Sequence, residues 1–187
     1  MSADAISSRR AALASMLAMA ACAVLAAVCG AAHASVSGAL RRPWPSNRAT
    51  PPLALPGYEG PAWSLQAARG KVVVMNFWAG WCEPCRAEMP SLELLAARHE
   101  ADGLVVVAVN HRETDAAIRR FLDQMPVTLP IVRDSDGAAA RDWGVRVFPS
   151  TVIVGRDGRA RFTVVGEVDW TGPEARQWLA PLLREQP

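Results

Sequence analysis

The stretch that decides the fold is VVVMNFWAGWCEPC, residues 72–85. Residues 72–77 form a continuous β-prone run, which is typical of a strand buried on both faces. Two cysteines follow, Cys82 and Cys85, and from Cys85 to about His99 the apolar residues recur at helical spacing. The stretch therefore predicts a strand, a short turn and a helix that begins at the cysteines.

The patterns on either side predict an α/β fold with a mixed central sheet and helices on both faces. Further strands are expected at 104–109, 131–132, 151–154 and 162–165, the last two as a hairpin. Helices are expected at 114–125 and 138–143. A last helix is expected to be capped by Thr171 and to end near Arg184, and a hairpin is expected within 53–70.

The first part of the chain predicts export. Arg9 and Arg10 precede residues 11–32, which contain no charged residue, and Ala32-His33-Ala34 has the small-x-small pattern of a cleavage site. A signal core has roughly 7–15 apolar residues and a membrane span about 20. Residues 1–34 are therefore expected to be a signal peptide or a membrane anchor, and cleavage, lipidation and retention stay open.

Two further segments follow from composition. Residues 35–52 mix Pro, Ser and Arg without apolar periodicity and predict a flexible linker, so the folded domain is expected at 53–187. The formal net charge of +2 is too small to suggest nucleic-acid binding.

Cysteine usage points to redox chemistry. Cys22 and Cys29 lie in the export segment, which leaves Cys82 and Cys85 as the pair of the folded domain. A bridge across so short a loop stabilises little, and a structural zinc site would need a second Cys or His pair. At a helix N-terminus Cys82 would be held as the attacking thiolate, with Cys85 one turn further on as the resolving thiol.

The run VVVMNFWAGWCEPCRAEMPSLE resembles the active-site sequence of the thioredoxin superfamily, and in particular the TlpA/ResA group of periplasmic or membrane-tethered thiol-disulfide oxidoreductases. The resemblance covers roughly residues 53–187. It implies a thioredoxin-like fold with an N-terminal hairpin extension and a central insertion. It also implies that Pro149 is a cis-proline facing the cysteines, and that the backbone of Phe148 could pair with a substrate segment.

Neighbouring residues are expected to tune the cysteines. Asn76 stands where thioredoxin has a buried Asp and cannot accept a proton, so Glu88, which matches an acidic position of the ResA-like motif, is the candidate base. Glu83 places a negative charge between the cysteines, which favours the disulfide and makes the dithiol a reductant. Pro84 completes the WCxPC pattern, and Trp81 is expected to cover the disulfide and contact the substrate.

The resemblance also implies partners. The substrate would be an exported disulfide protein, such as apocytochrome c or an assembly factor of cytochrome oxidase, and a membrane thiol reductase in the bacterial envelope would supply electrons. We expect a periplasmic monomer with no cofactor beyond the Cys82–Cys85 disulfide and no metal. Two alternatives on this fold remain, a copper chaperone and a thiol peroxidase, although Phe148-Pro149 stands where the chaperone would carry a His.

Overall fold

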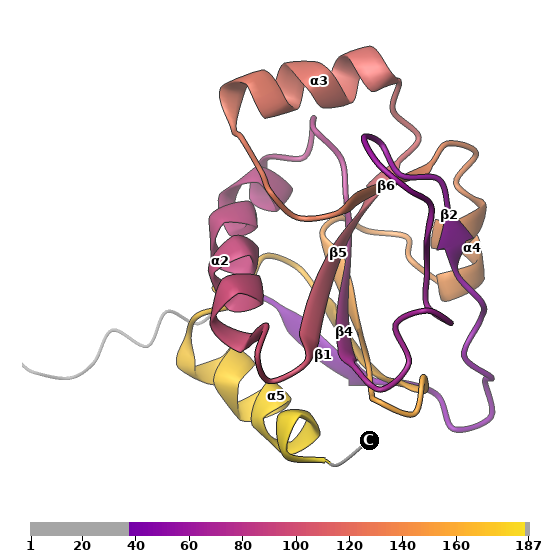
Figure 1. Ribbon diagram of the computed structural model, residues 1–187, viewed down its shortest axis with the longest axis vertical. Coiled ribbons are helices and arrows are strands. Elements are labelled where there is room, and N and C mark those ends of the chain that lie inside the picture. Colours follow the sequence, from indigo (N-terminus) through magenta and orange to yellow (C-terminus); the bar gives the residue numbers. More distant parts are fainter. Residues whose placement is uncertain (1–37, 186–187) are drawn as a thin grey trace, which may run out of the picture. The chain divides into compact units, whose positions relative to one another are not determined.

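The computed structural model describes residues 38–185 (Figure 1). It has a six-stranded sheet of order β1-β8-β7-β4-β5-β6. β4 pairs in parallel with β5, and β5 with β6, whereas β7, β8 and β1 add antiparallel. The predicted mixed sheet is therefore confirmed. The strands and helices are β1 Leu40–Pro43, β2 Ala54–Leu55, β3 Trp63–Ser64, β4 Val72–Trp78, α2 Glu83–His99, β5 Leu104–His111, α3 Asp115–Gln124, β6 Ile131–Asp134, α4 Ala138–Trp143, β7 Ser150–Val154, β8 Ala160–Val165 and α5 Pro173–Arg184.

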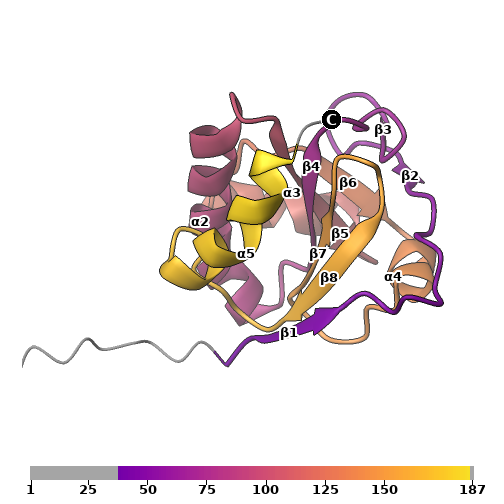
Figure 2. The same ribbon diagram turned by 90° about the horizontal axis from the view of Figure 1, so that it is seen from below.

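The central strand β4 is buried along its whole length because both faces of the sheet are covered. Val72 and Val74 lie in one apolar cluster with Leu92 of α2 and Leu179 of α5. Val73, Met75 and Phe77 point the other way, into a second cluster that contains Trp143 of α4. Figure 2 shows α2 and α5 on one side of the sheet and α4 on the other, which confirms that helices cover both faces.

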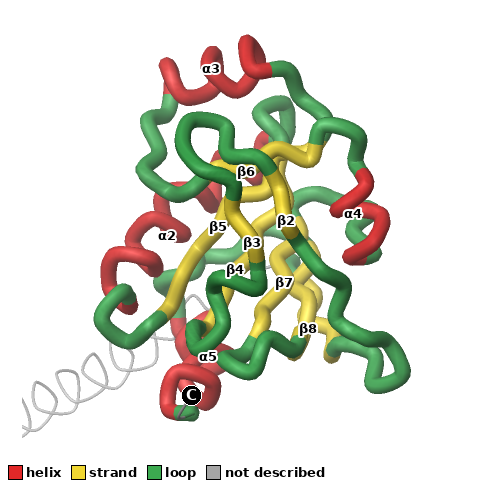
Figure 3. Tube along the Cα trace, turned by 45° about the vertical axis from the view of Figure 1, so that its right-hand side comes forward, coloured by secondary structure: helices red, strands yellow, loops and turns green. Residues whose placement is uncertain are grey.

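The N-terminal hairpin extension is also confirmed, as β2 and β3 pair with each other. The connection between them lies along β6, where Tyr58 N donates to Ile131 O at 2.8 Å and Arg133 N donates to Pro56 O at 3.0 Å. Figure 3 shows β2 beside β6 at this edge of the sheet. The hairpin segment therefore covers the edge that β6 would otherwise expose.

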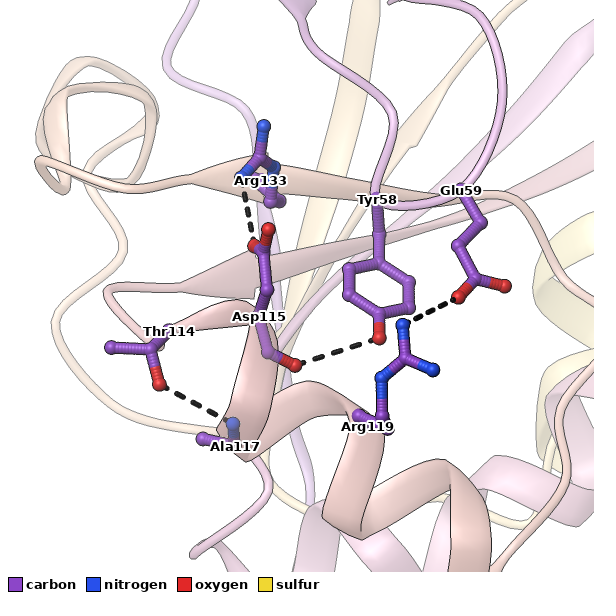
Figure 4. Close-up of polar contacts among 7 residues, drawn as sticks. All are labelled: Tyr58, Glu59, Thr114, Asp115, Ala117, Arg119 and Arg133. Atoms are coloured by element: carbon purple, nitrogen blue, oxygen red, sulfur yellow. Dashed lines mark hydrogen bonds and ion pairs between the residues drawn. The ribbon is translucent and has the colours of Figure 1, made fainter.

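Side chains join the same hairpin segment to α3 (Figure 4). Tyr58 donates its hydroxyl to the carbonyl oxygen of Asp115 at 3.5 Å, and Arg119 lies 3.4 Å from Glu59. Arg133 of β6 pairs with the Asp115 side chain at 2.7 Å. The start of α3 is thus attached to both the hairpin and the sheet, and Thr114 caps the helix.

The expected flexible linker at 35–52 is wrong from Leu40 onward. Leu40 pairs with Val165 and Pro43 with Phe162, so this segment adds a strand to the sheet. Beyond β1, the ring of Trp44 packs 5.6 Å from the ring of Trp143. The folded domain therefore begins well before residue 53.

The export prediction for residues 1–34 lies outside the described residues. Within residues 38–185, no helix combines the length and the apolar content needed to cross a membrane.

The predicted cap of the last helix is wrong, although its extent is confirmed. The residue before α5 is Gly172, and Pro173 occupies the first turn, where its missing N–H costs nothing. Thr171 instead donates its hydroxyl to Asp169 at 2.6 Å and belongs to the preceding turn.

Candidate active site

The two cysteines form a disulfide at the N-terminus of α2, with an S–S distance of 2.04 Å and Cα atoms 5.3 Å apart. Cys82 is the residue that caps the helix, and its sulfur accepts a hydrogen bond from Cys85 N at 3.3 Å. Free backbone N–H groups and the helix dipole stabilise negative charge at this position. Because Cys82 is 4% exposed and Cys85 is fully buried, Cys82 is the sulfur that an incoming group meets first.

Of the three aromatic residues that precede the cysteines, two are buried in the core and one is exposed. Phe77 and Trp78 are completely buried, and the ring of Trp78 lies 4.6 Å from that of Phe121, so both are packing residues. Trp81 is 69% exposed and flanks the disulfide on the outside. It is therefore available to contact another molecule.

The loop before β7 supplies the opposite wall of the site. The Phe148–Pro149 peptide bond is cis, as the resemblance implied. Ser150, the next residue, pairs with Phe77 at the end of β4, which places this loop at the cysteine end of the sheet. The Phe148 ring meets the Trp81 ring edge-on at 6.0 Å, so the two predicted substrate-contact residues touch.

Glu88 is a buried carboxylate inside α2, only 2% exposed. One oxygen accepts a hydrogen bond from Asn76 Nδ2 at 2.6 Å. The other accepts from Val168 N at 3.2 Å and from Trp170 Nε1 at 3.3 Å. Burial nevertheless dominates and raises the pKa of Glu88 from 4.5 to about 7, which suits a group that exchanges protons near neutral pH.

Asn76 joins Glu88 to the neighbouring strand. Its Nδ2 atom also donates to Thr151 Oγ1 at 3.0 Å, while its Oδ1 atom is buried and has no hydrogen-bond partner among the described residues. The Asn76 amide thus stabilises the charged form of Glu88, and the two candidate tuning residues act on each other directly.

Glu83 and Pro84 occupy the first turn of α2 between the cysteines. The Glu83 side chain is 91% exposed and lies 3.9 Å from Arg86, a distance and an exposure at which the ion pair is weak. Glu83 therefore adds a negative charge at the helix start, and Pro84 fits a position whose N–H has no partner within the helix.

Two sets of contacts at the site escaped the sequence reasoning. Glu113 accepts hydrogen bonds from Gly80 N at 2.6 Å and from Asn110 Nδ2 at 2.7 Å, which ties the loop before Cys82 to the end of β5. Val168 and Trp170 reach Glu88 from a loop 80 residues further along the chain. Asn110 and Glu113 follow the predicted strand at 104–109, and that position was the only local signal that could have pointed to the first set.

No group of three or more His, Cys, Asp or Glu side chains within residues 38–185 is arranged to hold a metal ion. Of the two histidines there, His99 pairs with Asp102 at 2.7 Å. His111 lies against Phe148, with ring centroids 4.8 Å apart.

A buried strand that runs into a helix starting at a cysteine pair, with a cis-proline loop opposite, defines a thioredoxin-like protein. The chain belongs to the AhpC/TSA family, whose model matches residues 47–163.

The chain is also similar in sequence to named thioredoxin-like proteins. The thioredoxin-like protein YneN of Bacillus subtilis is 42% identical over 111 residues, which cover 58% of this chain and 64% of that protein. The thiol-disulfide oxidoreductase ResA of Bacillus thuringiensis subsp. konkukian is 32% identical over 109 residues, which cover 58% and 63%. The chain thus spans slightly less than two thirds of the length of these relatives.

Among solved structures, a putative thiol:disulfide interchange protein DsbE from Chlorobium tepidum superposes with a TM-score of 0.68 at 31% identity, covering 72% of this chain and 95% of that one. A putative thioredoxin from Neisseria meningitidis gives a TM-score of 0.64 at 27% identity, covering 72% and 89%. Both confirm the thioredoxin-like fold.

Proposed function

We propose that the protein is a thiol-disulfide oxidoreductase that reduces disulfides of exported proteins. The observation that carries this proposal is the Cys82–Cys85 disulfide at the start of α2, with Cys82 outermost and the Trp81–Phe148 wall beside it. In the reduced protein, the Cys82 thiolate attacks a substrate disulfide and forms a mixed disulfide, and one substrate sulfur leaves as a thiol. Cys85 then attacks the Cys82 sulfur, which releases the second substrate thiol and restores the internal disulfide.

Glu88 is proposed as the base that takes the proton from Cys85 in the second step. Its buried position in the same helix and its pKa of about 7 support this role, because such a carboxylate can accept and return a proton near neutral pH. Asn76, which donates to the carboxylate, would keep Glu88 partly ionised and therefore competent to accept that proton.

Location and partners follow from the remaining sequence features. Residues 1–34 support export to the periplasm, with the segment removed, lipidated or kept as an inner-membrane tether. A membrane thiol reductase would return electrons to the disulfide, and the protein would act as a monomer without a further cofactor or a metal and without binding nucleic acid. The names of the ResA relatives are consistent with disulfide substrates, which we extend to apocytochrome c or to assembly factors of cytochrome oxidase.

The proposed direction of electron flow depends on Glu83. Equilibration with a glutathione buffer should give a reduction potential near that of thioredoxin, about −270 mV. Glu83→Lys should stabilise the Cys82 thiolate and raise the potential by about 30 mV, a tenfold change in the equilibrium constant. A wild-type potential near −120 mV would contradict the reductant assignment, and Arg119→Gln serves as the control for a remote change of charge.

The partner can be identified by stopping the reaction halfway. Cys85→Ser should accumulate mixed disulfides between Cys82 and substrate proteins in cells, because the resolving thiol is missing. Non-reducing electrophoresis followed by mass spectrometry would show these adducts, and the double variant Cys82→Ser, Cys85→Ser should show none. If Cys85→Ser forms no adducts although the wild-type protein reduces small disulfides, the assignment of protein substrates is wrong.

A further inference from the structure

The surface beside the disulfide continues past Trp81 onto two neighbouring loops. We call it the Phe148 surface and define it by Trp81, His111, Arg112, Arg146, Val147 and Phe148. Phe148 lies in its middle, with the Trp81 ring at 6.0 Å on one side and the His111 ring at 4.8 Å on the other. Val147 is 56% exposed and Trp81 is 69% exposed, so the surface offers two large apolar side chains beside Phe148 for contact.

His111 and Arg112 are packed side by side. A Cβ atom added to Gly137 would lie 2.9 Å from both His111 Cε1 and Arg112 Cδ, so the imidazole ring and the arginine stem cover the same glycine. His111 Nδ1 lies 3.5 Å from the buried Asp134 Oδ2 atom and has no hydrogen-bond partner among residues 38–185. The stem of the Arg112 side chain therefore lies near the His111 ring that contacts Phe148.

The Phe148 surface carries two exposed positive charges. Arg112 and Arg146 are both exposed, and neither side chain forms a hydrogen bond or ion pair within residues 38–185, although the Arg112 backbone N donates to Asp134 O at 3.0 Å. The nearby acids direct their hydrogen bonds to other groups: Asp134 accepts from Ala139 N and Ala140 N at 3.0 and 2.9 Å, Asp136 from Ala138 N at 2.9 Å, and Glu113 from Gly80 N at 2.6 Å. Glu83 lies on the α2 side, near Arg86.

We propose that the Phe148 surface binds an acidic segment of the substrate protein beside the substrate disulfide. This inference rests on the proposed function. A substrate segment that pairs with the backbone at Phe148 presents every second side chain to the same face. A Glu or Asp two positions from the substrate cysteine would then lie over Arg112 and Arg146, and the apolar rings would cover the stretch around the cysteine.

Two matched peptides test the inference. Each contains one cysteine in a disulfide with 2-mercaptoethanol, and they differ only in having Glu or Gln two positions before and after that cysteine. The full chain is first reduced, freed of reductant and mixed with one equivalent of peptide, so that it supplies both electrons for a single turnover. At low ionic strength the Glu peptide should react about tenfold faster than the Gln peptide, and this ratio should fall towards one at about 0.5 M salt.

Substitutions in the Phe148 surface test whether it causes the preference for the Glu peptide. Arg112→Gln and Arg146→Gln should each lower the Glu/Gln rate ratio about threefold, whereas Arg119→Gln, an exposed arginine on α3 that pairs with Glu59, should leave it unchanged. A ratio of one in the wild type, or a ratio that the double variant Arg112→Gln, Arg146→Gln does not move, would overturn the inference.

Reduction of bis(2-hydroxyethyl) disulfide, which is uncharged, shows whether a negative result concerns the acidic-segment inference alone or the proposed function as well. If that disulfide is also not reduced, the oxidoreductase assignment itself is wrong. If it is reduced and the peptides do not differ, only the acidic preference is wrong.

Discussion

Cys82→Ser should lower the rate of disulfide reduction by at least about a thousandfold, because a serine hydroxyl is not ionised near neutral pH and is a far weaker nucleophile than a thiolate. The helix N-terminus at position 82 stabilises a negative charge, but the serine hydroxyl stays neutral and gains nothing from it. The measurement is the rate at which pre-reduced protein consumes bis(2-hydroxyethyl) disulfide.

Cys29→Ser is the matched control for this substitution, since it removes a cysteine of the predicted export segment and leaves the Cys82–Cys85 pair unchanged. That variant should react at the wild-type rate. A Cys82→Ser protein that keeps a tenth or more of the wild-type rate would contradict the assignment of Cys82 as the attacking group.

Glu88→Gln should remove a pH dependence of stability that the wild type shows. Below pH 4.5 the Glu88 carboxyl is protonated in the folded and unfolded chains alike. Between pH 4.5 and about 7 the unfolded chain loses this proton while the folded chain keeps it, so the folded state becomes less stable as the pH rises. The raised pKa corresponds to a loss of about 3 kcal/mol, complete once the pH has passed through 7.

The glutamine variant should fit the site because the unpaired Asn76 Oδ1 can accept from the new amide once the Asn76 side chain turns over. Urea unfolding of the oxidised proteins at several pH values between 4.5 and 8 is the measurement. The two proteins should be similar at the acid end, and the variant should be more stable by about 3 kcal/mol at pH 8. Parallel curves would show that Glu88 is ionised in the folded state throughout.

The fold was predictable from the sequence wherever burial leaves a pattern. The apolar runs of β4 and β5, the turn signal between β7 and β8, and the helical spacing after Cys85 each predicted an element that the structure confirms. The cysteine pair and the cis-proline were predictable for a different reason, since their local sequence resembles a known active site. The position of Cys82 as the helix cap then follows from where the buried strand ends.

The features that were missed depend on contacts between distant residues. The pattern of β1, Leu-Arg-Arg-Pro, has no buried side chain, and its pairing with the distant β8, where Arg41 lies over the Phe162 ring at 4.1 Å, makes it a strand. Glu88 was a candidate from its position, but the donors that hold it come from Asn76 on β4 and from a loop beyond β8. Thr171 had the spacing of a cap, yet Asp169 binds its hydroxyl first.

The strand β1 also determines what the protein presents to its own copies. Without it, β8 would form the border of the sheet and offer a row of unpaired N–H and C=O groups to any passing chain. With it, the border carries Arg41 and Arg42, whose like charges repel another copy, and ends at Pro43, which has no N–H to give. The four residues that were predicted as part of a flexible linker therefore protect the edge of the sheet against pairing with another copy of the chain.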